Sequence, residues 1–478
     1  MKSLTIGLAA GINPSVALAL KAELIGVGAR NDVRINVVTS EIEMRKDAPD
    51  TRIELGDRKI AALESVIELE RAGCDEVVVP DVRCEPFFDE VQTEVEVPMV
   101  SLYRGLPAVL EAAGVRRIGL LGVAVDREFF VKLLDGTAEV LELSDELKAL
   151  YRTVQDPETG LRRTGLTPEH KTALRKAADE LLGKGAELLV TACGQMARFV
   201  PDLKAEGLPV FDLLRDTAER AVLAPLVRRP KPFKVGMIGG LGPAATVDLY
   251  DKIVKATPAR NDQEHFKVAV EQNPQIADRT ACLLGNGTDP TLAMFNCARR
   301  LQEDGCDMLI VPCNTAHAFV PYLERNLRIP FINMQQVTME EIREKFGDAA
   351  RIGLLATTGT VKTGIYGKKA EAMSLPMFTP DEAHQERVMA AIYGPKGAKA
   401  GYTDGVCRED LVSAAEYLVT TYDCNCLILG CTELPLILDE TDDFQVAGKT
   451  VSLIDPTSAL ARRVVKEAQK AEAERGVR

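Results

Sequence analysis

Residues 305–313 read GCDMLIVPC, and residues 73–81 read GCDEVVVPD. In each stretch, Gly-Cys-Asp precedes a short apolar run and a proline follows it. Uninterrupted runs of Val, Ile and Leu of this length are typical of parallel strands that are buried on both faces. The stretch therefore predicts an α/β fold, and its recurrence predicts that the fold occurs twice in the chain.

The repeat continues on both sides of this stretch. ELLVTAC at 187–193 corresponds to NCLILGC at 425–431, and RIGLL occurs at both 117–121 and 351–355. Apolar runs predict strands at 5–8, 35–39, 76–79, 117–122 and 187–191, and again at 235–238, 267–270, 308–311, 351–355 and 426–429. Segments with helical spacing follow them, as in sheets built from crossover units.

The stretch 227–233 combines prolines with positive charge, and a new apolar strand begins just beyond it. Such a composition is typical of a linker. We expect two tandem domains, residues 1–228 and residues 233–478. The alternative, a loop within one domain, is disfavoured because the repeat restarts immediately after the stretch.

The composition narrows the classes of function. A chain of 478 residues, 46% hydrophobic and 27% charged, is expected to form a globular protein of at least two domains. Its formal net charge of −13 offers no basic surface for nucleic acid or an anionic membrane, so small molecules are the expected partners. No run approaches the roughly 18 apolar residues that a membrane span needs. Eleven scattered cysteines favour the reducing cytoplasm.

Two cysteines of the second half occupy matching places. Cys313 and Cys431 each stand at the carboxyl end of a predicted strand and precede a helical pattern. Ligands bind at that end of parallel strands. A helix amino terminus there is expected to lower the thiol pKa from about 8.5. Its N–H groups, together with Asn314, Thr315 and Thr432, are expected to hold a carboxylate.

A pair of thiols suits one reaction in particular. Racemisation needs a base on one face of the α-carbon and an acid on the other, with the roles exchanged in the reverse direction. Either cysteine alone is equally consistent with a buried structural residue. Two cysteines in matched strand-to-helix turns favour the catalytic interpretation.

Residues 233–478 resemble the aspartate/glutamate racemase family, and most of all its aspartate racemase branch. The matching motifs are GGLGPAAT at 239–246, NPQIADRT at 273–280, PCNTAH at 312–317 and GCTEL at 430–434. The resemblance implies domains of two similar lobes, each with a mainly parallel sheet flanked by helices. It also implies that substrate binds between the lobes and that no pyridoxal phosphate is used.

The resemblance further implies roles for individual residues. Cys313 and Cys431 would be the paired acid and base, acting on aspartate or a close relative such as glutamate or cysteate. Arg279 would bind carboxylates and Lys399 would add a second positive charge, with Gly240 also at the substrate. Residues 260–263 are expected to shape specificity.

Structural roles for these residues stay open as alternatives. Arg279 also fits a solvated residue at the start of a helix. Lys399 also fits the surface of a loop, in which case Lys396 is the other candidate for the second positive charge. His317 fits a packing role as well as a catalytic one. The glycines at 236–242 lack dinucleotide-binding spacing, and the alternation around Cys426 argues against a metal site, so we expect neither cofactor nor metal.

The first half departs from this pattern. It keeps Cys193 at the position of Cys431, but Asp81 stands where the second half has Cys313. Cys84 is one helical turn further on and is not expected to replace the missing base. We interpret residues 1–228 as a degenerate copy that is non-catalytic or regulatory. It could serve as a built-in pseudo-dimer partner; a homo-oligomer and a surviving Asp/Cys activity are the alternatives.

Two other functions compete with racemisation in the second half. One is decarboxylation or cis–trans isomerisation of a dicarboxylic acid on the same scaffold. The other is a non-catalytic amino-acid sensor, which the altered first half favours and the intact motifs of the second half oppose.

Overall fold

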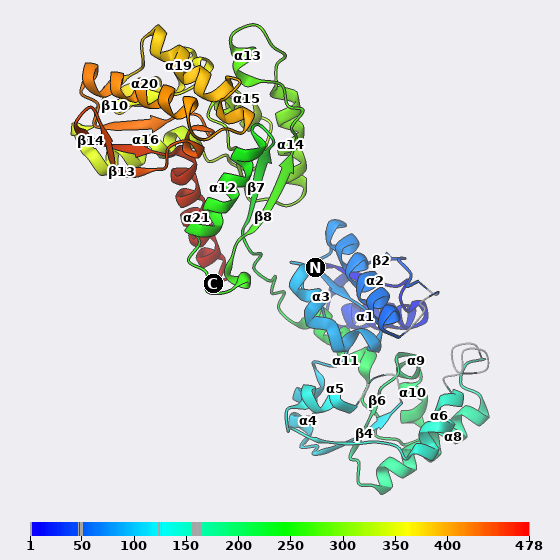
Figure 1. The fold of residues 1–478 in the computed structure, drawn as a ribbon. Helices are drawn as coiled ribbons and strands as arrows, with labels where there is room; N and C mark the ends of the chain where they lie inside the picture. The colour runs from blue at the N-terminus through cyan, green and yellow to red at the C-terminus, as the bar shows by residue number, and fades with distance from the viewer. Residues whose placement is uncertain are drawn as a thin grey trace. The chain divides into compact units, whose positions relative to one another are not determined.

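The computed structural model describes residues 2–45, 47, 51–122, 125, 127–154, 160 and 164–477. The chain divides into two compact units, unit 1 (Met1–Pro230) and unit 2 (Lys231–Arg478). The boundary falls inside the proline-containing stretch 227–233. Each unit has its own sheets and helices (Figure 1). Each also has its own buried core.

Unit 1 contains two three-stranded parallel sheets, ordered β2-β1-β3 and β5-β4-β6. The strands are β1 (Lys2–Ala9), β2 (Val33–Ser40), β3 (Glu76–Val78), β4 (Arg117–Leu121), β5 (Glu139–Leu141) and β6 (Leu188–Thr191). The helices are α1 (Pro14–Arg30), α2 (Thr51–Arg71), η1 (Val82–Phe87), α3 (Phe88–Glu94), α4 (Leu106–Ala113), α5 (Arg127–Leu134), α6 (Asp145–Val154), α8 (Pro168–Gly183), α9 (Gly194–Ala197), α10 (Val200–Ala205) and α11 (Leu213–Leu223).

Unit 2 has two lobes. Lobe I is the parallel sheet β8-β7-β9 with the helices packed on it, and lobe II is the five-stranded sheet β11-β10-β12-β14-β13 with its own helices. The strands are β7 (Lys234–Gly239), β8 (Lys267–Gln272), β9 (Met308–Ile310), β10 (Ile352–Leu355), β11 (Met377–Phe378), β12 (Cys426–Leu429), β13 (Thr441–Val446) and β14 (Lys449–Ile454).

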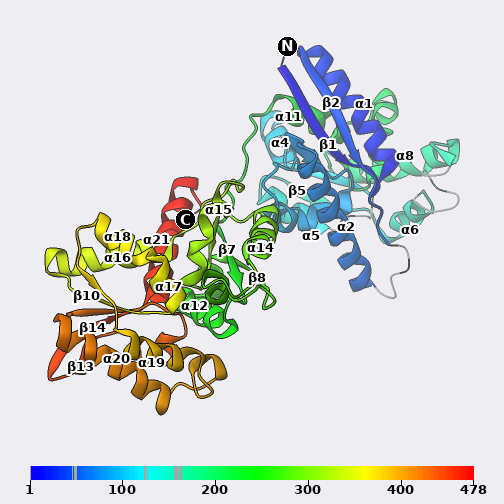
Figure 2. The ribbon, with the colours of Figure 1, turned by 90° about the horizontal axis from the view of Figure 1, so that it is seen from above.

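Helices cover the sheets of both lobes (Figure 2). Lobe I carries α12 (Pro243–Ala256), η2 (Asp262–Glu264), α13 (Arg279–Leu283), α14 (Thr291–Glu303), η3 (Thr315–Ala318), α15 (Val320–Glu324) and α21 (Pro456–Arg475). Lobe II carries α16 (Met334–Phe346), η4 (Gly347–Ala349), α17 (Thr358–Thr363), α18 (Ile365–Ala372), α19 (Glu382–Tyr393), η5 (Ala398–Ala400), α20 (Val406–Tyr422) and η6 (Leu434–Leu436).

The last helix returns the chain from lobe II to lobe I, where α21 packs against α12. Asp455 marks the crossing: its carboxylate caps α21 by accepting from the N–H groups of Thr457 and Ser458. The same carboxylate lies 2.6 Å from the Lys252 ammonium of α12. Because Asp455 is almost fully buried, this ion pair fixes the crossing point between the lobes.

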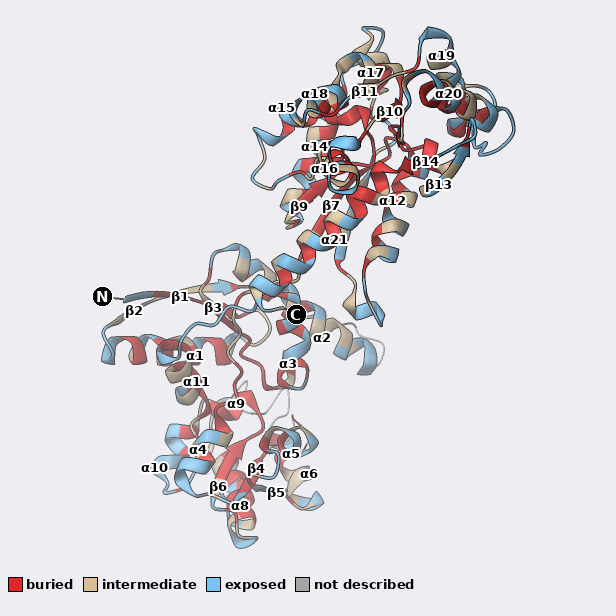
Figure 3. Cartoon of the chain, turned by 90° about the vertical axis from the view of Figure 1, so that its left-hand side faces the viewer, coloured by how far each residue is buried: buried red, intermediate tan, exposed pale blue. Residues whose placement is uncertain are grey.

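The strands predicted from apolar runs are all present, and the α/β prediction with tandem repeats of parallel sheets is confirmed. The central strands are buried, while the outer faces of many helices are exposed (Figure 3). Apolar clusters fill the space between sheet and helices, as the runs of Val, Ile and Leu require. Among the described residues, no helix is long and apolar enough to cross a membrane.

Candidate active site

The two cysteines of unit 2 line one pocket between the lobes. Cys313 follows β9 of lobe I, and Cys431 follows β12 of lobe II. The pocket also contains every other residue proposed for the site except Gly240: Arg279, Lys399, Asn314, Thr315 and Thr432. It is completed by Leu241, Thr280, Thr357, Tyr393 and Glu433.

The pocket is closed. Its cavity is only about 10 Å³, the space of a single water, whereas ligand pockets commonly measure ~300 Å³ or more. Contacts between the lobes hold it shut: the Thr432 hydroxyl donates to the Pro312 carbonyl, and the Tyr393 hydroxyl donates to Asp278. An amino acid therefore enters only after the lobes have moved apart.

The turn that carries Cys313 is held by His317. The Nδ1 of His317 lies 2.9 Å from the Cys313 carbonyl oxygen, and Nε2 accepts from the N–H of Met334 at 3.1 Å. Since Nε2 accepts, the proton is on Nδ1 and the ring is neutral. Burial lowers the pKa of His317 to about 4. The structure thus favours a supporting role for His317 over a catalytic one.

Asn314 is oriented by a residue of the other lobe. The Tyr366 hydroxyl, on α18, donates to Oδ1 of Asn314 at 2.6 Å, and both side chains are buried. This bond fixes which end of the amide is the oxygen. The Asn314 Nδ2 group has no hydrogen-bond partner among the described residues. A buried donor without a partner is costly unless a ligand satisfies it.

Arg279 is buried beside Cys313. Its Nη2 donates to the Leu241 carbonyl at 2.5 Å and its Nη1 to the Ala277 carbonyl at 3.0 Å, while Nε has no partner among the described residues. Burial works against the positive charge, but attraction and a hydrogen bond to Cys313 outweigh it and raise the pKa of Arg279. The interpretation of Arg279 as a solvated helix-start residue is therefore wrong, because only 7% of it is exposed.

Cys431 has a different environment. Its thiol donates to Oε2 of Glu433 at 2.9 Å, and Oε1 of the same carboxylate lies 2.5 Å from the Lys399 ammonium. Lys399 also lies over the Tyr393 ring, 5.4 Å from its centroid. Lys399 thus belongs to the site and not to a free loop surface, while its rival Lys396 lines a separate pocket beside α20.

Only short 3-10 turns follow the two cysteines, η3 after Cys313 and η6 after Cys431, and both are too short for an appreciable helix dipole. The expectation that a helix acidifies the thiol is wrong for Cys431. Burial, and then the negative charge of Glu433, raise the pKa of Cys431 well above its usual range. Cys431 is therefore held as a thiol in the resting site.

Four buried threonine hydroxyls join the lobes beside the pocket. Thr315 of lobe I lies 3.1 Å from Thr357 and 2.9 Å from Thr360 of lobe II, measured between Oγ1 atoms. Thr280 donates to Thr357 at 3.3 Å. The Thr315 hydroxyl therefore already has partners within the protein and contributes to lobe contact in this closed form.

Gly240 does not line the pocket, so its expected contact with substrate is not supported. Its N–H donates to Oγ1 of Thr246 at 3.0 Å. Its φ of +89° and the close backbone of Asn273, 2.5 Å from where a Cβ would stand, explain the glycine. Gly240 shapes the loop after β7.

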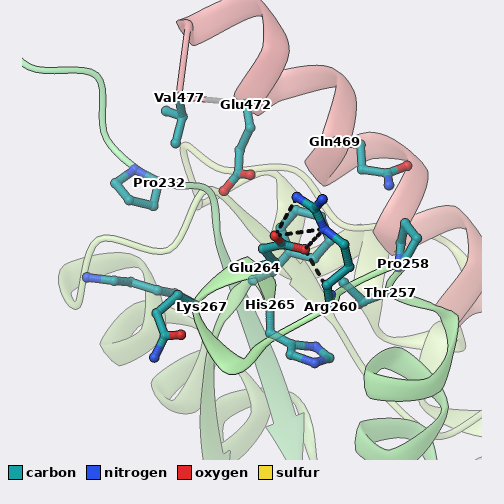
Figure 4. A pocket seen from close by; sticks show the side chains of 12 residues that line it. Pro232, Thr257, Pro258, Arg260, Glu264, His265, Lys267, Gln469, Glu472 and Val477 are labelled. Atoms are coloured by element: carbon teal, nitrogen blue, oxygen red, sulfur yellow. Dashed lines mark hydrogen bonds and ion pairs between the residues drawn. The ribbon is translucent and has the colours of Figure 1, made fainter.

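Residues 260–263 also lie away from the cysteines. Arg260 and Gln263 line a separate cavity of about 740 Å³ between the start of β8 and the end of α21 (Figure 4). Arg260 pairs there with Glu264, at 2.9 Å. These residues do not line the pocket of Cys313 and Cys431, because they precede β8 whereas the cysteines follow their strands, so a role in specificity stays a prediction.

Sequence reasoning missed Glu433, Tyr366 and Tyr393. Glu433 stood inside the GCTEL motif, two positions after Cys431, and its negative charge next to a thiol was a usable signal. The two tyrosines are distant in sequence from either cysteine. Only the packing of lobe II against lobe I brings their hydroxyls to Asn314 and Asp278.

The corresponding place in unit 1 is built differently. Asp81 follows β3 and forms a two-pronged ion pair with Arg83, whose Nη2 lies 2.6 Å from Oδ2. Cys193 follows β6 as predicted. Cys84 is buried in an apolar cluster, and burial raises its pKa well above the usual range. Asp81 is thus already paired, and Cys84 offers no substitute base.

No group of three or more His, Cys, Asp or Glu side chains placed to hold a metal ion occurs among the described residues. Cys426 lies inside strand β12, whereas Cys431 lines the pocket.

Comparison with known proteins places these observations in a family. The family model described as Asp/Glu/Hydantoin racemase matches the chain twice, over residues 15–221 and 238–464. Among curated proteins, the broad specificity amino-acid racemase RacX of Bacillus subtilis (strain 168) is 24% identical over 242 residues, which cover 48% of this chain and 96% of that protein. The glutamate racemase of Aquifex pyrophilus is 27% identical over 177 residues, covering 35% and 61%.

The chain is also similar to solved structures over about half of its length. The aspartate racemase of Picrophilus torridus is 30% identical, with 50% of this chain and 94% of that chain covered and a TM-score of 0.42. An aspartate racemase homologue from Pyrococcus horikoshii OT3 is 21% identical, with 49% and 99% covered and a TM-score of 0.40.

Proposed function

The chain belongs to the Asp/Glu/Hydantoin racemase family, and from this premise we propose that unit 2 is an amino-acid racemase that uses Cys313 and Cys431 as its two acid–base groups, without pyridoxal phosphate. The observation that carries the proposal is the single pocket into which two lobes each contribute one thiol. Aspartate is the first substrate to test, with glutamate and cysteate next.

The surroundings of the two thiols differ. The Arg279 guanidinium lies beside Cys313, whereas burial and the Glu433 carboxylate raise the pKa of Cys431 and keep it protonated. In one direction, the Cys313 thiolate takes the α-proton and Cys431 gives its proton to the opposite face of the α-carbon. In the other direction, each cysteine performs the other's step.

The intermediate carries extra negative charge on the α-carbon and its carboxylate. Arg279 Nε and Asn314 Nδ2 are buried donors that the described protein groups leave unused, and both belong to residues of the pocket. A carboxylate bound to them would satisfy both donors. Fixed donors in a closed, dry site stabilise developing charge better than water does.

The test is to incubate the purified protein with L-aspartate, L-glutamate or L-cysteate without added cofactor and to separate the enantiomers by chiral chromatography. We expect the D-enantiomer of at least one. Replacing Cys313 or Cys431 with serine should lower the rate by about 100-fold or more, because each removes one acid–base group. Failure of every substrate would contradict the proposal.

A further inference from the structure

One charged group of the pocket neither takes nor gives the α-proton in the two-thiol reaction. Glu433 is 4% exposed, and its carboxylate bridges the Cys431 thiol and the Lys399 ammonium. It also touches lobe I, since its Oε1 lies 2.6 Å from where a Cβ of Gly242 would stand. The carboxylate therefore fills the place between Lys399 and the loop after β7.

This bridge pairs Lys399, one of the two cations that line the pocket, with a carboxylate of the protein. Burial opposes the charge on Lys399, but attraction by Glu433 and Cys431 outweighs it and raises the pKa of Lys399. Arg279, on the Cys313 side, makes no such ion pair and keeps Nε unused among the described residues. The two cations are thus unequal: Arg279 is ready for a carboxylate, and Lys399 is already neutralised.

The charges of the pocket have a consequence for its substrate. Among the side chains that line the pocket, Arg279 and Lys399 balance Glu433 and the one thiolate that the proposed mechanism requires. A zwitterionic amino acid with an uncharged side chain leaves that balance unchanged. A second carboxylate, as in aspartate, adds an unbalanced negative charge to a buried site, which is costly.

We propose that Glu433 is a specificity-determining residue that weakens binding of a side-chain carboxylate by holding Lys399, so that the site accepts uncharged side chains of aspartate's size as well as aspartate. This inference rests on the proposed racemase function. Glu433 affects substrate binding indirectly, by pairing with Lys399 and by adding a negative charge to the pocket.

Aspartate and asparagine provide the test, because they differ in charge and hardly in shape. The Glu433→Gln variant removes the charge and keeps the size, and it frees the Lys399 ammonium. We expect wild-type kcat/KM for asparagine to lie within about tenfold of that for aspartate. In E433Q the ratio of aspartate to asparagine should rise by about tenfold or more, mainly through a lower KM for aspartate, as one charge-assisted contact would give.

A second substitution tests whether the gain for aspartate comes from the freed Lys399 ammonium or from a general change in the pocket. The gain for aspartate should disappear in the double variant E433Q/K399M, because it depends on the freed ammonium. Glu386→Gln, an exposed position on α19, is the matched control and should leave the ratio unchanged. Glu433→Ser, followed by thermal melting, serves if E433Q does not fold, and should shift the ratio in the same direction.

The outcomes are distinct. If the wild-type protein racemises neither amino acid nor any other tested, the proposed function fails. If it racemises either but E433Q changes both substrates in parallel, or the aspartate gain survives in E433Q/K399M, the role of Glu433 is refuted while the racemase assignment stands.

Discussion

At the residue scale, the two cysteines are chemically unequal although their positions in the lobes match. Cys313 lies beside the Arg279 guanidinium, and Cys431 donates to the Glu433 carboxylate. Burial and this carboxylate hold a proton on Cys431, whereas the charge next to Cys313 is positive. In the resting enzyme, Cys431 is therefore prepared to donate a proton.

This inequality predicts a shift in the pH–rate profile. The Glu433 charge contributes to the raised pKa of Cys431, so Glu433→Gln should lower that pKa. The limb of the kcat profile that reports Cys431 should move to lower pH, whichever enantiomer is supplied. The measurement is kcat against pH in both directions for E433Q and for the E386Q control. Superimposable profiles would contradict the role of Glu433 at this thiol.

His317 gives a second prediction, for stability. Its pKa is about 4 in the folded protein and about 6.5 when unfolded, so the unfolded chain binds more protons between those values. Its contribution is complete above pH 6.5 and is lost as pH falls through 4. We expect unit 2 to lose about 2 kcal/mol of unfolding free energy between pH 7 and pH 5 from this group.

Urea unfolding at both pH values checks this expectation. The His317→Gln variant cannot titrate at this position, so its pH dependence should be weaker than that of the wild type by about that amount. Equal losses in wild type and variant would show that His317 is not the group responsible.

At the scale of elements, lobe contacts decide whether the site is open or closed. Tyr366, the threonine hydroxyls and Tyr393 all join lobe I to lobe II around the pocket. The bonds of Thr315 and of the two tyrosines are made in the closed form and each joins the two lobes. Substrate entry must break part of this set, and the energy of closing is shared among several modest contacts.

The Tyr366→Phe variant tests one of these contacts. It leaves the buried Oδ1 of Asn314 without its donor, at a cost of about 1–3 kcal/mol, and lets the amide turn. We expect KM to rise by about tenfold, because carboxylate binding needs a fixed Nδ2 group. Tyr322→Phe, at an exposed position of α15, is the matched control in the same kinetic assay. A Tyr366→Phe enzyme with unchanged KM would contradict the orienting role of Tyr366.

The sequence predicted these elements unevenly. Buried strands such as β9 and β12 were visible because continuous apolar runs of that length, bounded by turn residues, are typical of strands buried on both faces. The hairpin of β13 and β14 was missed: β13 reads TDDFQV, and its polar residues resemble a loop. Its turn at Ala447 and Gly448, both at positive φ, was a weak signal because Ala rarely adopts that conformation.

The same limit applies to the site. Cysteines at strand ends could be predicted, since strand and turn are local features. The contacts of Tyr366 with Asn314 and of Lys399 with Glu433 join residues that are distant in sequence, and they depend on how the lobes close. The acidity of Cys431 was mispredicted for that reason, because burial and Glu433 outweigh the expected effect of the turn.

At the scale of the whole molecule, the duplication has left two units with unequal sites. Unit 2 has two thiols with cations beside them, whereas unit 1 has Asp81 paired with Arg83. We propose that unit 1 is non-catalytic. Replacing Cys193 with serine should therefore leave the rate of racemisation of the full chain within about twofold of the wild type in the chiral assay. A loss comparable to that of Cys431→Ser would place a working site in unit 1.

The linker offers a second prediction at this scale. Residues 224–230 are exposed, and Arg228 and Arg229 lie among them. Exposed segments between compact units are preferred sites of proteolysis. Brief trypsin treatment, followed by mass spectrometry, should yield fragments that end or begin near Arg229, with racemase activity in the C-terminal one. Early cleavage inside either unit instead would contradict the boundary.

Hydrogen exchange in D₂O decides whether two thiols act on opposite faces of one α-carbon. The protein is incubated with L-aspartate, or with whichever L-amino acid proves to be its substrate, and both enantiomers are recovered before a tenth of the substrate has reacted. We expect deuterium at the α-carbon of the D-product, because the donating thiol has exchanged with solvent, and protium in the remaining L-substrate, because the other thiol returns the hydrogen it took. Protium retained in the product, or deuterium appearing equally in both enantiomers, would refute the two-thiol mechanism.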